Sequence, residues 1–472
     1  MAKAEICEMG VTELGRLYRR GQLSPMEVIE AHLQRAERLN PLLNAFLLLL
    51  KDSARQAALA ADALFKAGID LGPLQGIPIS IKDLIRVRGT RTTAGSRVLV
   101  EEAVDAADAW IVRRLREAGS VIIGKTNLHE FASGDPDPEG PFGLVQNPRR
   151  IGYHPGSSSS GAGAATAAGL GTIAIGTDSG GSVRIPACLC GIAGLKPTTG
   201  RISLNGIIPL STTVDTVGPL ARRVSDVAAA FSVCTAKDSE DLDSSWEHFL
   251  RRLEEPVSGW QVGIPRQGFF RKVQPVVEES FQKTLSVLED LGCQLRDFHP
   301  PEVEAMPDLL STIIQAEGSA YHQRYAGKED LYAPGFRERI LQGREIKATA
   351  YIEALDKMRE LQQEWLGQIN RYDAVIVPGI PSIAPKHGAT TVEIQGESFP
   401  FRALLGRFTR PFNLLGWPAL TVPNGISPEG LPTGIQIVGK PDHEIRLFIL
   451  GNHLERAFGL LPKLGIDPRP GP

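Results

Sequence analysis

Apolar residues recur along the chain with helical spacing in some segments and as short continuous runs in others. The clearest helix signal follows Ser24, Pro25 and Glu27, which form a capping box ahead of apolar residues three and four positions apart. Helices are predicted over residues 24–39, 54–66, 110–118, 162–168, 276–291 and 347–369. Apolar runs predict strands over residues 74–83, 121–123, 172–175, 373–378 and 418–423. This alternation predicts an α/β protein whose central sheet carries helices on both faces.

The composition is that of a globular chain and excludes several other classes. Of 472 residues, 42% are hydrophobic and 22% charged, and the formal net charge is −3. A chain this close to neutral offers no basic field, so we expect no nucleic-acid partner. The longest aliphatic run, residues 46–50, falls far short of the ~18 residues of a membrane helix, and we expect no membrane association. Five cysteines form neither a disulfide framework nor a zinc pattern, which favours a cytoplasmic location.

The segment from Gly119 to Thr126 matches the phosphate-loop pattern letter for letter. A phosphate loop needs a turn after a strand, so that backbone N–H groups face the phosphates. The central residues Val121, Ile122 and Ile123 are instead typical of the strand itself. We interpret the segment as a helix-to-strand connection in which Gly119 ends the helix. A nucleotide-binding protein remains the hypothesis from a different functional class.

Three segments together indicate a nucleophilic chemistry. Lys82 lies near the end of the predicted strand 74–83, a serine run follows Pro155, and residues 176–186 are GTDSGGSVRIP. The serine run is bounded by a dense Ala/Gly helix, which argues against a polar linker. Neither serine segment contains the G-x-S-x-G elbow of α/β-hydrolases. Consecutive glycines after a strand leave backbone N–H groups free to converge on one point, as an oxyanion requires.

The three segments resemble the amidase signature family, whose catalytic unit is Ser–cis-Ser–Lys. GTDSGGSVRIPA is similar to the family's nucleophile motif and places the nucleophile at Ser182. PGSSSSGAGAA places the cis-serine at Ser158, and GIPISIKD places the base at Lys82. The family usually has glycine where this chain has Ser157, so the cis peptide bond would join Ser157 to Ser158.

Two more segments, GKTNLHEFASG at residues 124–134 and PFNLLGWPALTVP at 411–423, are similar to family motifs. The strong resemblance covers about residues 70–220, and a weaker one covers most of the chain. It implies a single α/β domain over residues 1–472, with a central mixed sheet covered by helices and a catalytic core at about 70–220. It implies no metal and no organic cofactor.

The resemblance also implies a mechanism. A serine hydroxyl needs a base to become nucleophilic, and a buried lysine can be that base when it is neutral. Lys82 would accept a proton through Ser158 while Ser182 attacks the carbonyl carbon. The oxyanion would be bound by a set of backbone N–H groups, those of Ser179, Gly180, Gly181 and Ser182. Residues expected to support the site without acting as nucleophile or base are Asp178, Arg184 and Ser157.

The leading functional prediction is an amidohydrolase that cleaves small-molecule amides with water through a serine acyl-enzyme. Esters and carbamates present a similar electrophile, so a urethanase-like activity is a variant of the same prediction. The alternative is the glutamine amidotransferase subunit of an aminoacyl-tRNA amidation complex, which shares this core and works with partner subunits. Candidates for lining the substrate pocket are Phe131, Ser133, Phe412 and Trp417. The sequence leaves the substrate and the oligomeric state open.

Overall fold

Eleven strands form one sheet in the part of the chain that the structure, a computed structural model, describes: residues 3–133, 138, 140–235, 246–266 and 268–460. In spatial order they are β1 (Phe46–Leu49), β3 (Val121–Thr126), β2 (Pro78–Lys82), β4 (Ile173–Asp178), β6 (Thr216–Ala221), β5 (Ala193–Lys196), β12 (Ala419–Ile426), β13 (Pro432–Val438), β9 (Ala374–Pro378), β7 (Gln261–Ile264) and β8 (Gln294–Asp297). Strands β3, β2 and β4 run parallel to one another, as do β9, β7 and β8, and antiparallel pairs join these groups. The sheet is therefore mixed, as the family resemblance implies.

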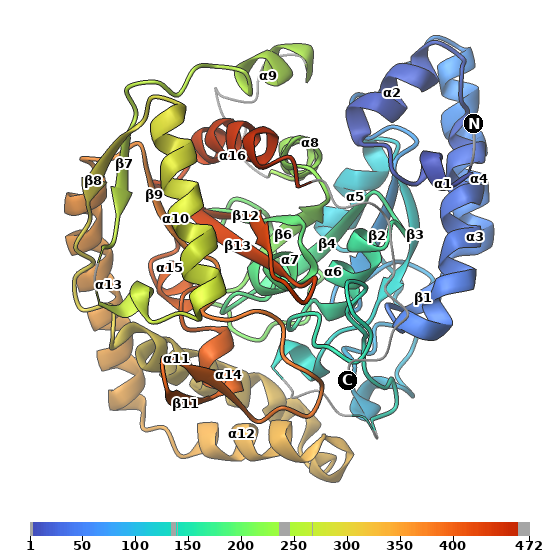
Figure 1. Cartoon of the computed structure of the whole chain (residues 1–472). Coiled ribbons are helices and arrows are strands. Elements are labelled where there is room, and N and C mark those ends of the chain that lie inside the picture. Colours follow the sequence, from blue (N-terminus) through green and yellow to red (C-terminus); the bar gives the residue numbers. More distant parts are fainter. Residues whose placement is uncertain (1–2, 134–137, 139, 236–245, 267, 461–472) are drawn as a thin grey trace.

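Helices cover both faces of this sheet (Figure 1). Ile376 of β9 packs into one apolar cluster, while its neighbours Val375 and Val377 pack into another, because successive side chains of a strand point to opposite faces. The first face is covered mainly by α2 (Val11–Arg19), α5 (Trp110–Glu117), α8 (Val224–Cys234), α9 (Trp246–Arg252), α10 (Pro275–Asp290) and α16 (Glu444–Phe458).

The second face carries a different set of helices. They are α3 (Pro25–Leu43), α4 (Lys51–Lys66), α6 (Ser160–Ala167), α7 (Arg184–Cys190), α11 (Met306–His322), α13 (Ala348–Ile369) and α15 (Arg410–Leu414). Helices α3 and α4 lie toward the β1 end of the sheet and α13 toward the β8 end (Figure 1). Short elements complete the chain: α1 (Lys3–Ile6), α12 (Pro334–Arg344), α14 (Phe401–Leu405) and the hairpin β10 (Thr391–Ile394) with β11 (Glu397–Pro400).

The predicted helices and strands lie close to their observed positions. The predicted capping box is confirmed, since Ser24 Oγ accepts from the Glu27 N–H at 3.2 Å and the Glu27 carboxylate accepts from the Ser24 N–H at 2.8 Å. The strand predicted over 74–83 is shorter, because Gly76 has φ +76° and belongs to a turn before β2 begins at Pro78. The predicted alternation and the covered sheet are both observed.

The phosphate-loop match lies inside the sheet, as the strand interpretation predicts. Residues 121–126 are strand β3, paired with β1 on one side and β2 on the other, and all six are buried. Lys125 Nζ lies 2.7 Å from an Asp83 carboxylate oxygen and donates to Thr92 Oγ1 at 2.9 Å. The pairing of β3 with both neighbours uses its backbone groups, and the lysine already has an anionic partner.

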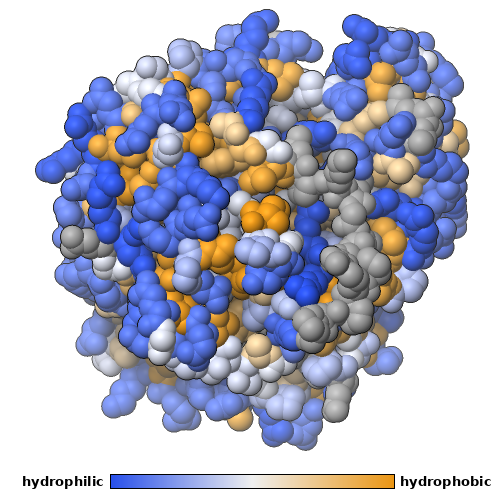
Figure 2. Space-filling model, viewed as in Figure 1, coloured by the Kyte–Doolittle hydropathy of each residue, from blue (hydrophilic) through white to orange (hydrophobic). Residues whose placement is uncertain are grey.

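The hydropathy of the surface and the state of the cysteines can be compared with what the composition predicts. The face shown in Figure 2 is largely hydrophilic, with hydrophobic residues gathered in patches between hydrophilic ones. Cys7, Cys188, Cys190, Cys234 and Cys293 are all free thiols and all buried. No helix in the described ranges combines the length and the apolar character that a membrane crossing requires.

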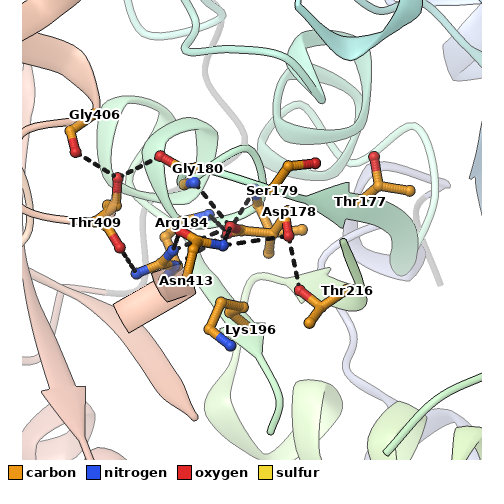
Figure 3. A network of polar contacts seen from close by, with 12 residues as sticks. Thr177, Asp178, Ser179, Gly180, Arg184, Lys196, Thr216, Gly406, Thr409 and Asn413 are labelled. Carbon is orange, nitrogen blue, oxygen red and sulfur yellow. Dashed lines mark hydrogen bonds and ion pairs between the residues drawn. The ribbon is translucent and has the colours of Figure 1, made fainter. Parts of the chain in front are cut away.

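A buried ion pair between Asp178 and Arg184 ties the sheet to the helices at its centre (Figure 3). Arg184 donates from Nε to one Asp178 carboxylate oxygen at 3.0 Å and from Nη2 to the other at 3.0 Å. It also donates to the Thr409 carbonyl at 3.0 Å, to Gln436 Oε1 at 2.7 Å and to Asn413 Oδ1 at 2.6 Å. Each of its five N–H groups thus has an acceptor.

Charge compensation keeps this pair ionised without solvent. Burial alone would raise the pKa of Asp178, but the charge and hydrogen bonds of Arg184, with the Asn413 amide and the charge of Lys196, hold that pKa well below its usual range. The pair joins β4 and the following helix α7 to Asn413 of α15 and Gln436 of β13, which lie 229 and 252 residues after Arg184 in the sequence.

We predict that MgATP at millimolar concentration does not change the melting temperature of the protein. A ligand that binds the native state raises this temperature by mass action, and β3 has neither a phosphate turn nor an unpaired lysine to offer. Differential scanning fluorimetry checks it. A saturable rise in melting temperature that is lost in Lys125→Ala would contradict the strand interpretation.

We predict that Asp178→Asn lowers the free energy of unfolding by about 3–5 kcal/mol, because it leaves the buried Arg184 charge without compensation. Urea denaturation followed by circular dichroism measures the loss. The matched control is Glu279→Gln, which removes an exposed carboxylate 2.8 Å from Lys283 and is expected to leave the free energy of unfolding almost unchanged. Equal small losses in both variants would show that the buried pair is not a determinant of stability.

Candidate active site

Parallel pairing of β2 with β4 brings Lys82 and Thr177 together at the carboxyl ends of the two strands. Lys82 Nζ lies 2.8 Å from Thr177 Oγ1 and 2.8 Å from Ser158 Oγ. Every residue of β2 is buried, so the lysine side chain emerges from the apolar interior of the sheet. The candidate base and the candidate cis-serine, 76 residues apart in sequence, are thus in direct contact.

The surroundings of Lys82 favour its neutral form. Burial lowers the pKa of Lys82 to about 7, although the negative charges of Asp178 and Asp215 act to raise it. The amine contacts two hydroxyl groups and no carboxylate among the described residues. A lysine with a pKa near neutrality can accept a proton and later return it.

The serine run that precedes α6 supplies Ser158. The peptide bond between Ser157 and Ser158 is cis, as the resemblance implies. The adjoining Ser159 N–H donates to the main-chain carbonyl of Ser182 at 3.2 Å, which connects the serine run to the loop between β4 and α7. Ser157, Ser158 and Ser182 line the same pocket, to which Ser179 and Gly180 also contribute.

The loop that carries Ser182 is folded around the Asp178 carboxylate. Gly181 N–H donates to one carboxylate oxygen at 2.8 Å and Val183 N–H to the other at 3.1 Å. Gly181 has φ +118°, and a Cβ there would meet the Thr409 hydroxyl, so only glycine suits this position. Of the four N–H groups predicted to bind the oxyanion, that of Gly181 donates to Asp178. The N–H groups of Ser179, Gly180 and Ser182 make no hydrogen bond to this carboxylate and are the stronger candidates for an oxyanion site.

Asp215 is a residue at the site that the sequence did not indicate. It accepts a short hydrogen bond from Ser179 Oγ, and its other oxygen accepts from the Leu210 and Ser211 N–H groups at 2.8 Å and 3.1 Å. Burial raises the pKa of Asp215 to about 6, against these hydrogen bonds, which lower it. Asp215 thus fixes the side chain of Ser179, whose N–H belongs to the candidate oxyanion set. No motif marks this aspartate, which follows an ordinary loop.

The four predicted pocket residues do not share one location. Ser133 lines the pocket with the serines. Phe131 instead packs against His322 and Phe336, with ring centroids 4.4 Å and 5.4 Å away, and Phe412 and Trp417 lie in the apolar cluster of α11 and α13. None of these three aromatic residues lines the pocket, because their rings pack in the apolar core behind it.

Two histidines, His129 and His154, line the pocket, and His387 lies next to His154 behind them. The His154 ring is 5.6 Å from that of His129 and 5.7 Å from that of His387. Burial, together with the neighbouring His129 and His387, holds the pKa of His154 well below its usual value, and His154 Nδ1 accepts from the Gly156 N–H at 2.9 Å. These contacts agree with a structural role for His154. Within the described residues, no group of three His, Cys, Asp or Glu side chains is placed to hold a metal ion.

The chain resembles known proteins along nearly its whole length. A family model described as Amidase matches residues 27–448. A glutamyl-tRNA(Gln) amidotransferase subunit of Heliobacterium modesticaldum is 34% identical over 96% of this chain and 98% of that protein. The corresponding protein of Synechococcus sp. strain CC9605 is 34% identical, over 95% of this chain and 96% of that protein.

Solved structures of amidases have the same fold as this chain. A structure described as an amidase superposes with a TM-score of 0.87 at 32% identity, covering 96% of this chain and 100% of that one. The peptide amidase of Stenotrophomonas maltophilia superposes with a TM-score of 0.81 at 27% identity, covering 97% and 99%. The family model and the relatives show the family, and these structures show the fold. This chain belongs to the amidase signature family.

Proposed function

We propose that the protein hydrolyses the C–N bond of a carboxamide through an acyl-enzyme on Ser182. The observation that carries the proposal is the 2.8 Å contact between Lys82 Nζ and Ser158 Oγ, at the wall of the pocket that Ser182 also lines. A buried amine with a pKa of about 7 is a competent base near neutral pH, and a serine hydroxyl beside it is a relay for a proton.

The proposed steps use these groups twice. Lys82 takes the hydroxyl proton of Ser158 while Ser158 takes that of Ser182, whose Oγ forms a bond to the carbonyl carbon. The N–H groups of Ser179, Gly180 and Ser182 stabilise the oxyanion, and the relay returns the proton to the nitrogen as the C–N bond breaks. Water then attacks the ester of Ser182 through the same relay, which releases the acid and restores the serine.

Two physiological settings use this reaction. The leading prediction is a free-standing amidase for small-molecule amides, with esters and carbamates as related substrates. The curated relatives are named as components of an amidotransferase, and at 34% identity over nearly full length they favour the second setting more than the first. In that setting the amide is glutamine, and protein partners receive the ammonia. Release of ammonia or an amine from a carboxamide is common to both.

We predict that the purified chain releases ammonia from primary amides without ATP and without a partner protein, and that Ser182→Ala abolishes the release. The reason is that the proposed base, relay and nucleophile all belong to this one chain. A coupled ammonia assay with a panel of primary amides measures it, and an amine assay extends the panel to aryl amides and carbamates. A fluorophosphonate probe should label one peptide containing residue 182.

The matched control for this experiment is Ser286→Ala, which changes an exposed serine on α10 and should leave both readouts unaltered. Labelling that persists in Ser182→Ala would remove this residue as the nucleophile. Release of ammonia only from glutamine, and only when partner proteins are present, would identify the amidotransferase setting and reject the free-standing one.

We predict that kcat/KM for an amide rises with pH through an apparent pKa of about 7, far below the ordinary lysine value of 10.5. Below this pKa the Lys82 amine is protonated and cannot accept the serine proton, so the rate falls about tenfold per pH unit. Lys82→Ala should lower kcat/KM by roughly 10²–10⁴-fold, and more for an amide than for its matched ester, because an amine leaving group must be protonated. Discontinuous assays of the amide and its matched ester from pH 5 to 9 measure both effects.

Lys196 provides the control, since burial and the nearby Arg184 also lower its pKa to about 7 while its Nζ donates to the Pro197 carbonyl. Lys196→Met should keep the pH profile of the wild type if it folds, as judged by circular dichroism. A profile that is flat between pH 6 and 8, or one that moves with Lys196 instead of Lys82, would disprove the role of Lys82 as base.

A further inference from the structure

The pocket that contains Ser182 is lined by three arginines from three helices. They are Arg339 of α12, Arg402 of α14 and Arg410 of α15. None of the described lining residues is an aspartate or a glutamate. Arg339 donates to Ser133 Oγ at 3.0 Å and Arg402 to the Ser133 carbonyl at 2.8 Å, so these two are held by protein groups.

Arg410 lies beside the loop that forms the candidate oxyanion site. A Cβ built on Gly180 would be 3.6 Å from Arg410 Cγ, and one built on Gly406 would be 2.7 Å from Arg410 Nε. Glycines on both sides therefore leave the space through which this side chain passes. The guanidinium is held next to the residues that would bind the reacting carbonyl group.

Arg410 has few partners for a charge in a partly buried position. Among the described residues its guanidinium makes a long hydrogen bond from Nη1 to Ser311 Oγ at 3.4 Å, and no described carboxylate lies within 4.0 Å of it. Burial lowers the pKa of Arg410, the positive charge of Arg402 adds to this effect, and the negative charge of Asp308 opposes it. A guanidinium nevertheless stays protonated in proteins, so the positive charge persists in a poorly solvated place.

Arg410 lacks the hydrogen-bond acceptors and the carboxylate partner that Arg184 has. Arg184, a short distance away in the same region, uses five N–H groups on five acceptors and pairs with Asp178. Poorly solvated charges in proteins are normally compensated in this way, because an unpaired one costs free energy. Arg410 faces the pocket instead, where a substrate can supply the missing anion. Gln315, one helical turn from Ser311 on α11, also lines the pocket and can donate an amide N–H.

We propose that the amide substrate carries a carboxylate and that Arg410 binds it. The substrate class is an amide of a short dicarboxylic acid, with the carboxamide at Ser182 and the free carboxylate at the guanidinium. This inference rests on the proposed function, because the carboxamide must occupy the Ser182 end of the pocket. A planar guanidinium suits a carboxylate, which it can bind with two parallel hydrogen bonds. An α-ammonium group such as that of glutamine finds no carboxylate in the described lining.

The experiment compares ammonia release from the monoamide of glutaric acid with release from pentanamide, its neutral counterpart without the carboxylate. The wild type should prefer the anionic amide by roughly thirtyfold or more in kcat/KM. Arg410→Met should remove this preference, mainly through a higher KM for the anionic amide, so that the ratio of the two kcat/KM values falls to about one. Arg410→Lys should restore part of the preference, because it returns the charge without the planar fork. Arg359→Met, on the exposed side of α13, changes the same charge elsewhere and should keep the preference.

A second readout does not depend on catalysis. Glutarate should raise the melting temperature of the wild type but not of Arg410→Met, and 1,5-pentanediol should raise neither. If no amide is hydrolysed, the proposed function fails, and this melting shift still decides the anion site. Equal kcat/KM for both amides in the wild type, equal losses for both in Arg410→Met, or an equal glutarate shift in both proteins would overturn the assignment. So would a preference for glutamine that survives Arg410→Met.

Discussion

The Asp178 carboxylate is the group around which the site is arranged. It has no contact with solvent, so its charge must be satisfied entirely by protein donors. Arg184 supplies three of the hydrogen bonds, counting its backbone N–H, and Gly181, Val183 and Asn413 supply the others. Because two of these donors are backbone groups on either side of Ser182, the position of the candidate nucleophile is fixed by the same contacts that compensate the charge.

The ion pair also controls the neighbouring lysine. An isolated carboxylate near Lys82 would stabilise the ammonium form and raise the pKa of that amine. With Arg184 bound to Asp178, much of this negative charge is cancelled locally, and the desolvation of Lys82 prevails. Asp215 acts in the same direction as Asp178 but has a pKa raised to about 6, so it too exerts only part of a full charge at mildly acidic pH. The low pKa of this amine next to two carboxyl groups is therefore a result of ion pairing and burial together.

Sequence patterns predicted the elements whose boundaries have local causes. The capping box at Ser24 and the strands β3, β4 and β9 could be read from neighbouring residues, because caps and apolar runs are local signals. The resemblance to the family motifs predicted that Lys82, Ser158 and Ser182 belong to one site. Local signals do not record which distant loop meets a strand end, and so Asp215 and Arg410 were missed. The same limit explains the aromatic residues: a ring in a motif can fill the core or line a pocket, and Phe131 and Phe412 do the former.

The two physiological settings differ in recognition and not in the chemistry of the acyl-enzyme. Either requires a neutral base, a relay serine and an oxyanion site, so the contacts of Lys82 and Ser158 are equally compatible with both. What separates a zwitterionic amino acid from a simple anionic amide is the need for a negative group opposite the ammonium. The described lining of this pocket contains three arginines and no such group. On our proposal, the charge of the pocket therefore selects the substrate more than the identity of the candidate catalytic residues does. The similarity to the amidotransferase subunits bears on the reaction that we propose at Ser182, while Arg410 bears on the substrate of that reaction.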